Sequence, residues 1–255
     1  MSDAIELIEK IEKTTPEFWN YVWQDDNPIF NPVEELEIPY NKVFEKYIPY
    51  SKGKAIEVGC YPCNIISYIS NKFGYFPEGI DFTKKLEETA KKVFEVNGIK
   101  KYKVYHNDFL TWKPKEKYEL VTSFGFIEHF DYPEMIVKKH IDMLKPNGTL
   151  VLEVPNFNGL RYFIAKLTDG KTLKKHNMEV MDTKFYEWIA EKYSLEIKYL
   201  DYFGEFEYCW LNYYPNWLQK VIYYPFKILS KILCGYKFNS KFMSSYLLFI
   251  ARKKK

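Results

Sequence analysis

The stretch KAIEVGCYPCN, residues 54–64, indicates the fold of this chain. An apolar run ends there in an acid and a glycine, and a helix-like pattern follows, which predicts a strand, a tight turn and a helix. Such a turn lets backbone N–H groups approach a ligand, and the helix start adds a partial positive charge. A second strand end at Asp81 would lie beside this turn if the two strands are parallel neighbours, and its carboxylate could bind ribose hydroxyls. The stretch therefore predicts a cofactor site.

The composition predicts one globular unit. Of the 255 residues, 47% are apolar and 19% are aromatic, so a large core can form. The first six residues are acidic and lack an apolar signal core, and no stretch approaches the roughly 18 apolar residues of a membrane-spanning helix. Four cysteines are too few for a disulfide scaffold. We therefore expect a cytoplasmic protein.

The carboxyl-terminal end is basic and aromatic. Residues 208–255 contain nine lysines and arginines and no acid, which is typical either of a surface for an anionic partner or of a solvated face. Within this end, residues 217–233 place apolar side chains on one helical face and lysines on another, although Pro225 interrupts the pattern. Such an amphipathic element would contact a membrane surface, a partner groove or the core of the protein itself.

Strand and helix patterns alternate along the middle of the chain. We expect strands at 54–58, 103–106, 118–124 and 149–155, a further strand that ends with 79–81, and helices at 65–73, 86–94 and 133–144, with the turn 145–148 before the fifth strand. A cap at 156–180, a helix at 182–193 and strands at 195–202 and 244–251 follow. This order predicts an α/β fold with a doubly wound, mostly parallel seven-stranded sheet.

Three segments of a single domain are expected: an amino-terminal helical lid at 1–49, a cofactor-binding core at 50–155, and a substrate-side part at 156–255 that holds an aromatic and basic insertion before the last strand. In the first segment, helices are predicted at 3–13 and 33–49. The aromatic residues between Phe18 and Trp23 would either pack on the core or form a lid whose rings face a cationic ligand.

Five stretches in order resemble the motifs of class I S-adenosylmethionine-dependent methyltransferases: 55–60, 79–82, 107–109, 123–130 and 144–150. The resemblance covers residues 50–155 well, and 176–202 and 244–253 more loosely. In that family the first loop usually has two more glycines, where this chain has Tyr61 and Cys63. Side chains at these positions would narrow the approach to the methionine end of the cofactor.

The resemblance implies that S-adenosylmethionine is the cofactor and assigns residues to its parts. Glu57, Gly59, Cys60 and Tyr61 would hold the methionine, Asp81 the ribose, and Phe82, Asn107, Asp108 and Phe109 the adenine. Ser123, Phe124 and Gly125 would line the methyl-transfer site at a strand end. Some relatives bind magnesium through a Glu-x-x-Glu-His cluster, but the first of these glutamates is Gly125 here, so no metal is expected.

Methyl transfer to an alcohol needs a base, and a histidine is suited to this near neutral pH. His129, just after the fourth strand, and His176, in the cap, are the candidates. The resemblance is closest to bacterial small-molecule and surface-glycan methyltransferases. It predicts O-methylation of a sugar or a phosphorylated glycan precursor in surface polysaccharide biosynthesis, in the cytoplasm or at the inner membrane face.

Three other classes stay open. An RNA methyltransferase would use the basic end, but no RNA-binding module is recognisable, so a nucleic-acid partner is not expected. A non-catalytic cofactor-binding or scaffold protein would fit the missing glycines. A thiol–disulfide oxidoreductase would use the C-x-P-C pair Cys60 and Cys63. Monomer and homodimer both remain open.

Overall fold

The structure, a computed structural model, describes residues 13–23, 40–168, 170–204 and 239–254, together with the isolated positions 221, 225 and 228. The predicted helix at 3–13 lies almost wholly outside the described residues, as do 33–39 of the next predicted helix and most of the amphipathic element at 217–233. Among the described residues, none of the helices combines the length and the apolar character needed to cross a membrane.

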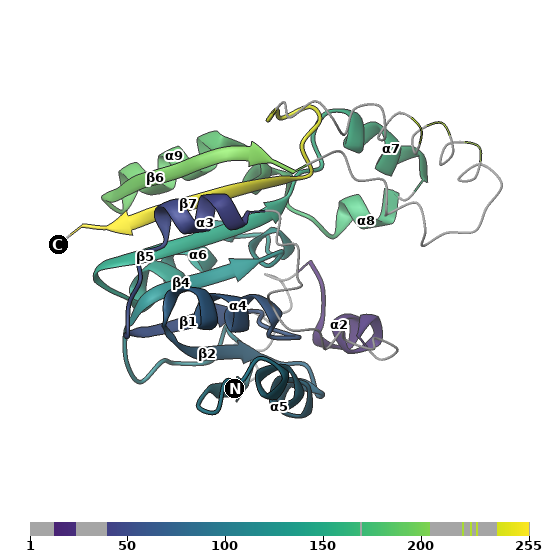
Figure 1. Cartoon of the computed structure of the whole chain (residues 1–255). Coiled ribbons are helices and arrows are strands. Elements are labelled where there is room, and N and C mark those ends of the chain that lie inside the picture. Colours follow the sequence, from purple (N-terminus) through teal and green to yellow (C-terminus); the bar gives the residue numbers. More distant parts are fainter. Residues whose placement is uncertain are drawn as a thin grey trace.

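Seven strands form one sheet in the order β3-β2-β1-β4-β5-β7-β6 (Figure 1). They are β1 (Lys54–Val58), β2 (Phe76–Asp81), β3 (Lys103–His106), β4 (Tyr118–Phe124), β5 (Leu144–Pro155), β6 (Leu195–Phe203) and β7 (Tyr246–Lys253). Neighbours from β3 to β5 are parallel, whereas β7 is antiparallel to both β5 and β6. The predicted mostly parallel seven-stranded sheet is confirmed.

Helices cover both faces of the sheet. On one side lie α3 (Asn41–Tyr47), α4 (Asn64–Phe73) and α5 (Leu86–Val96), and on the other α6 (Pro133–Met143) and α9 (Thr183–Lys192). Side chains of a strand alternate between the two cores: Ile56 and Val58 of β1 face the α6 side, and Ala55 faces the α4 side. Both faces of the central strands are therefore buried.

Three predicted boundaries differ from the structure. The last strand, predicted at 244–251, is β7 at Tyr246–Lys253, and of the helix predicted at 33–49 the described part is α3 at Asn41–Tyr47. The third lies before the fifth strand. The expected turn at 145–148 lies inside β5, which begins at Leu144 directly after α6 ends. Leu144 pairs with Tyr118, and the register then shifts so that Thr149 pairs with Leu120. The turn residues are thus absorbed as an irregularity within the strand, where Asn147 adopts a φ of +63°, a conformation that asparagine tolerates.

The parallel strands all point toward one edge of the sheet, and the added segments gather there. Figure 1 shows α2 (Pro16–Val22), α7 (Leu160–Thr168) and α8 (Gly170–Lys174) at this edge. A short 3₁₀ turn, η3 (Met178–Met181), leads from α8 to α9. Ligands of open α/β sheets bind outside the carboxyl ends of the strands, so this edge is where a site is expected.

Candidate active site

The turn after β1 brings its backbone close to β2. The N–H groups of Gly59 and Cys60 both donate to the carbonyl oxygen of Ile80, at 2.9 and 3.2 Å. Gly59 has a φ of +70°, and a Cβ there would lie 2.7 Å from the ring of Phe126. Both observations require glycine at this position. Cys63, which precedes α4, also has a left-handed φ, of +78°, so the loop keeps a glycine-like backbone there without glycine.

Tyr61 and Cys63, the two side chains predicted to narrow the approach to the methionine end of the cofactor, lie in different surroundings. The hydroxyl of Tyr61 accepts a hydrogen bond from Thr89 at 3.5 Å, and its ring packs 5.4 Å from that of Trp23. The Tyr61 side chain therefore lies beside the loop, against Thr89 and Trp23. The Cys63 side chain is fully buried in the α4-side core, with its sulfur 3.8 Å from that of Cys60.

The surroundings of the cysteine pair are unsuited to thiol–disulfide exchange. Cys60 is 1% exposed, and burial raises the pKa of its thiol well above the ordinary value. A reactive thiol needs a lowered pKa and access to solvent. Cys60 instead packs against Gly79 of β2, where a Cβ would lie 2.6 Å from the Cys60 sulfur and 2.9 Å from its Cβ. The pair is part of the packing between β1 and β2.

Asp81 ends β2 with its carboxylate held in place. Oδ2 accepts from the Tyr61 N–H at 3.2 Å, and Oδ1 accepts from both the N–H and the hydroxyl of Thr83, at 2.7 and 2.6 Å. Burial raises the pKa of Asp81, and these hydrogen bonds oppose the rise. The side chain is thus already oriented toward the turn after β1.

Glu57 and Ser123 lie behind this surface. The Oε2 atom of Glu57 accepts from the N–H of Ile66 at 2.8 Å, which joins the strand end to the first turn of α4, and burial raises the pKa of Glu57. Ser123 is 1% exposed. Neither residue lines the cavities described below, so any action of Glu57 on a ligand would be indirect.

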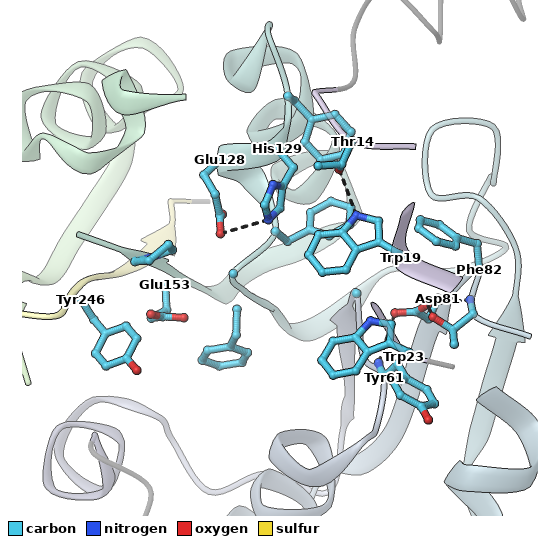
Figure 2. A pocket seen from close by; sticks show the side chains of 17 residues that line it. Thr14, Trp19, Trp23, Tyr61, Asp81, Phe82, Glu128, His129, Glu153 and Tyr246 are labelled. Carbon is cyan, nitrogen blue, oxygen red and sulfur yellow. Dashed lines mark hydrogen bonds and ion pairs between the residues drawn. The ribbon is translucent and has the colours of Figure 1, made fainter. Parts of the chain in front are cut away.

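A cavity of about 420 Å³ opens at the carboxyl ends of β1, β2, β4 and β5 (Figure 2). Its lining is mostly aromatic and acidic: Thr14, Trp19, Trp23, Gly59, Tyr61, Asp81, Phe82, Thr83, Phe124, Gly125, Phe126, Glu128, His129, Phe130, Glu153, Pro155 and Tyr246. Figure 2 shows Asp81, Phe82, Trp23 and Tyr61 on one side and Glu128, Glu153 and Tyr246 on the other. We call the side with Asp81 the cofactor side, because the sequence predicts the cofactor there, and the side with Glu128 and Glu153 the second side.

The predicted adenine residues line a smaller adjoining cavity. Asn107, Asp108 and Phe109 share it with Gly59, Asp81 and Phe82, which also line the larger one. Asp108 caps its own turn, since Oδ1 accepts from the Leu110 N–H at 2.7 Å. This cavity is only about 20 Å³, the space of one water molecule. An adenine ring would enter after movement of a lining side chain such as Phe126, which borders both cavities.

His129 is fixed in the wall of the larger cavity, in the 3₁₀ turn η2 (Ile127–His129). Its Nδ1 lies 3.0 Å from the carbonyl oxygen of Lys175, and its Nε2 lies 3.6 Å from Oε1 of Glu128. Burial and the neighbouring His176 lower the pKa of His129 to about 3. His176 itself does not line the cavity: its ring packs 4.8 Å from that of His129 and 4.7 Å from that of Phe157.

Glu128, His129 and His176 together have the donor atoms of a metal site. One ligand atom from each lies within 4.8 Å of the others, and a carboxylate with two imidazoles suits several divalent metals. The sequence predicts no metal because Gly125 replaces a ligand of some relatives, and this stays a prediction. Sequence reasoning missed that the 175–177 segment is tied to η2, where Asn177 donates its N–H to the Glu128 carbonyl at 2.6 Å.

Two acids on the second side of the cavity were missed. Glu128 and Glu153 are 1% and 5% exposed, and neither was assigned a role from sequence. A signal was available for Glu153, because it is a lone acid within the apolar run 149–155. Oε2 of Glu128 has no hydrogen-bond partner among the described residues, and burial, together with the charge of Glu153, raises the pKa of Glu128.

Helix α2 brings two aromatic side chains to the cavity. Trp19 lies 4.9 Å from the ring of His129 and donates its Nε1–H to Thr14 at 2.9 Å, and Trp23 packs on Tyr61. The segment is anchored by the Lys13 N–H, which donates to the His129 carbonyl at 2.7 Å. This placement agrees with the alternative that the aromatic segment faces a ligand, and its action as a lid stays a prediction.

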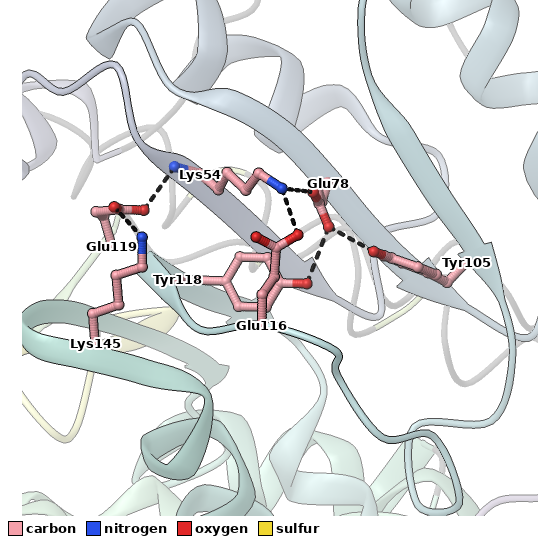
Figure 3. Close-up of polar contacts among 7 residues, drawn as sticks. All are labelled: Lys54, Glu78, Tyr105, Glu116, Tyr118, Glu119 and Lys145. Atoms are coloured by element: carbon pink, nitrogen blue, oxygen red, sulfur yellow. Dashed lines mark hydrogen bonds and ion pairs between the residues drawn. The ribbon is translucent and has the colours of Figure 1, made fainter.

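A further buried acid, Glu78, lies away from the cavity, toward the amino ends of the strands (Figure 3). Its Oε2 accepts from the hydroxyls of Tyr105 and Tyr118, at 2.8 and 3.0 Å, and its Oε1 lies 3.2 Å from Nζ of Lys54. Lys54 also donates to Glu116. This cluster joins β1, β2, β3 and β4, and the charge of its acid is offset within the protein by Lys54.

Comparisons with known proteins agree with this architecture. The family model described as "Methyltransferase domain" matches residues 35–200. The ubiquinone biosynthesis O-methyltransferase of Pelagibacter ubique is 26% identical over 76% of this chain and 85% of its own length, and that of Actinobacillus pleuropneumoniae is 28% identical over 68% and 73%.

Among solved structures, a methyltransferase of Thiobacillus denitrificans in complex with S-adenosylhomocysteine superposes with a TM-score of 0.61. The match covers 94% of this chain and 99% of that one at 13% identity, so it shows a shared fold. The chain belongs to the methyltransferase-domain family and is a class I methyltransferase that uses S-adenosylmethionine.

Proposed function

We propose that this enzyme methylates a hydroxyl group on a sugar ring, with His129 as the base. The observation that carries the proposal is the hydrogen bond between His129 Nδ1 and the Lys175 carbonyl. A carbonyl oxygen can only accept, so Nδ1 holds the ring proton and Nε2 has a free lone pair. That lone pair lies beside Glu128 in the wall of the cavity.

The tautomer suits this role. With its pKa lowered to about 3, His129 is neutral at physiological pH, so Nε2 has a free lone pair. The same shift makes His129 a weaker base, which a negative charge on Glu128, 3.6 Å away, would counteract. When bound, S-adenosylmethionine supplies a methyl group on a positively charged sulfur. His129 Nε2 would take the proton of the acceptor hydroxyl as its oxygen receives that methyl group, and the Glu128 carboxyl at 3.6 Å would offset the charge that develops.

The lining of the cavity favours a polyhydroxylated ring. Carboxylates such as Glu128 and Glu153 accept hydrogen bonds from hydroxyls, while aromatic faces such as Phe124 and Tyr246 pack on ring C–H groups. Among the described lining residues there is no lysine or arginine. If the acceptor is a phosphorylated glycan precursor, as the sequence predicts, its phosphate would therefore stay outside the cavity.

A phenolic acceptor is the second candidate, because the relatives are named for ubiquinone biosynthesis and are O-methyltransferases. The other predicted features remain proposals: membrane contact through 217–233, of which only Val221, Pro225 and Ile228 are described, a place at the inner membrane face, and the oligomeric state.

Incubation with labelled S-adenosylmethionine and two panels, nucleotide sugars and phenols, tests the proposal. We expect label in a sugar methyl ether, with no loss after dialysis against EDTA. His129→Gln should lower kcat at least about 100-fold while binding S-adenosylhomocysteine as tightly as the native protein. Label found only in phenols would shift the acceptor class, and an unchanged kcat would exclude His129 as the base.

A further inference from the structure

Two buried carboxyl groups share the second side of the cavity. They come from neighbouring elements at the strand ends: Phe124 pairs with Glu153 across β4 and β5, the Gly125 N–H donates to the Glu153 carbonyl at 3.1 Å, and Glu128 follows three residues later. Oε1 of Glu128 lies over Gly125, where a Cβ would be 3.6 Å away. The backbone thus brings both acids to the same side of the cavity, with Glu128 beside His129.

Glu128 lacks a partner for part of its carboxylate. Its Oε2 is inaccessible to solvent and makes no hydrogen bond to any described residue, and the side chain as a whole is 1% exposed. A buried carboxylate without a partner costs several kcal/mol. Since Glu128 lines the cavity (Figure 2), a bound cation at Oε1 would offset the charge of the whole carboxylate, including the buried Oε2.

The neighbourhood favours a cation over a neutral donor. A second acid, Glu153, lines the same side, and two buried negative groups are stabilised together by one positive charge. The rings of Trp19, Phe124 and Tyr246 line the cavity as well, and aromatic faces attract cations. The described lining contains no lysine or arginine.

We propose that the acceptor carries a protonated amine that binds to Glu128 and Glu153, on the carbon next to the hydroxyl that is methylated. The spacing supports adjacent carbons, because Glu128 Oε1 and His129 Nε2 are 3.6 Å apart and each would contact one of the two groups. The acceptor class is then a vicinal amino alcohol, such as a 2-amino sugar with a free amine. This inference rests on the proposed sugar O-methylation.

The first test compares matched acceptors: the methyl glycosides of glucosamine, N-acetylglucosamine and glucose. We expect kcat/KM for the amino sugar to exceed that of the other two by at least about tenfold. In Glu128→Gln the ratio should fall to near one, while Glu87→Gln, an exposed acid on α5, should keep it. Binding of S-adenosylhomocysteine verifies that both variants are folded. Equal kcat/KM values in the native enzyme, or a preference that survives Glu128→Gln, would overturn the proposal.

A binding test separates the amine site from the reaction. With the protein saturated in S-adenosylhomocysteine, calorimetry compares cyclohexylamine with cyclohexanol. Tighter binding of the amine, lost in Glu128→Gln, would support the ammonium site even if no sugar were methylated, in which case only the proposed function fails. Equal binding would overturn the amine proposal, as would stoichiometric Zn²⁺ or Mn²⁺ that displaces the amine from Glu128.

Discussion

Buried acids at the two ends of the sheet have different partners. Toward the amino ends, Glu78 accepts from two tyrosine hydroxyls and pairs with Lys54, so the protein itself supplies its partners. At the carboxyl ends, Glu128 is equally buried, but no lysine or arginine among the described residues pairs with it. Burial of an acid is therefore common to both ends. What marks the functional end is the missing cationic partner, which a ligand can supply.

The largest expected effect is on cofactor binding, and it should distinguish two acids of the same strand, Asp81 and Glu78 of β2. Asp81→Asn removes the charge at the carboxyl end of β2 but keeps an acceptor for Thr83. We expect the Kd for S-adenosylhomocysteine to rise about 100-fold, the loss of roughly two charge-assisted hydrogen bonds to the ribose. Calorimetric titration measures it. Glu78→Gln on the same strand is the control and should leave the Kd unchanged; equal effects of the two variants would remove the distinction.

A second prediction concerns the satisfied end. Glu78→Gln removes the negative partner of Lys54 and weakens the acceptor for Tyr105 and Tyr118, so we expect the free energy of unfolding to fall by about 2 kcal/mol. Urea denaturation measures this change. The control is Glu116→Gln, whose side chain is 39% exposed and also contacts Lys54, and which should cost about 0.5 kcal/mol or less. Similar losses in the two variants would mean that burial of Glu78 does not increase its contribution to the free energy of unfolding.

The smallest effect should have the opposite sign. The pKa of Glu128 is raised, so the folded state keeps this proton to higher pH than the unfolded state and loses stability as pH rises above the ordinary carboxyl value. The Glu128→Gln variant has no carboxyl group at this position, so it does not lose stability in this way as the pH rises. We expect its Tm to exceed that of the native protein by about 2–4 °C at pH 8, as for roughly 1 kcal/mol in a domain of this size, and by less at pH 5. A lower Tm at pH 8 would instead show that the protein stabilises the ionised carboxylate.

The local order of apolar runs and turn residues in the sequence was enough to predict the core of the fold and the cofactor side of the cavity. Strand ends can be read from apolar runs that stop at Gly59 and Asp81, and parallel neighbours must meet at one edge. The second side depends on contacts between distant segments. His176 lies beside His129 because Lys175 and Asn177 form hydrogen bonds with His129 and Phe130, more than 40 residues away in the sequence. The periodicity of the sequence gives no sign of such a contact.

The packing of Cys60 on Gly79 also limits how this chain can evolve. A Cβ at position 79 would be too close to both the sulfur and the Cβ of Cys60, so alanine at position 60 would not make room for it. A side chain at position 79 therefore requires the turn at Cys60 to move away from β2. Across a set of homologues, glycine should accordingly predominate at position 79 wherever residue 60 has a side chain.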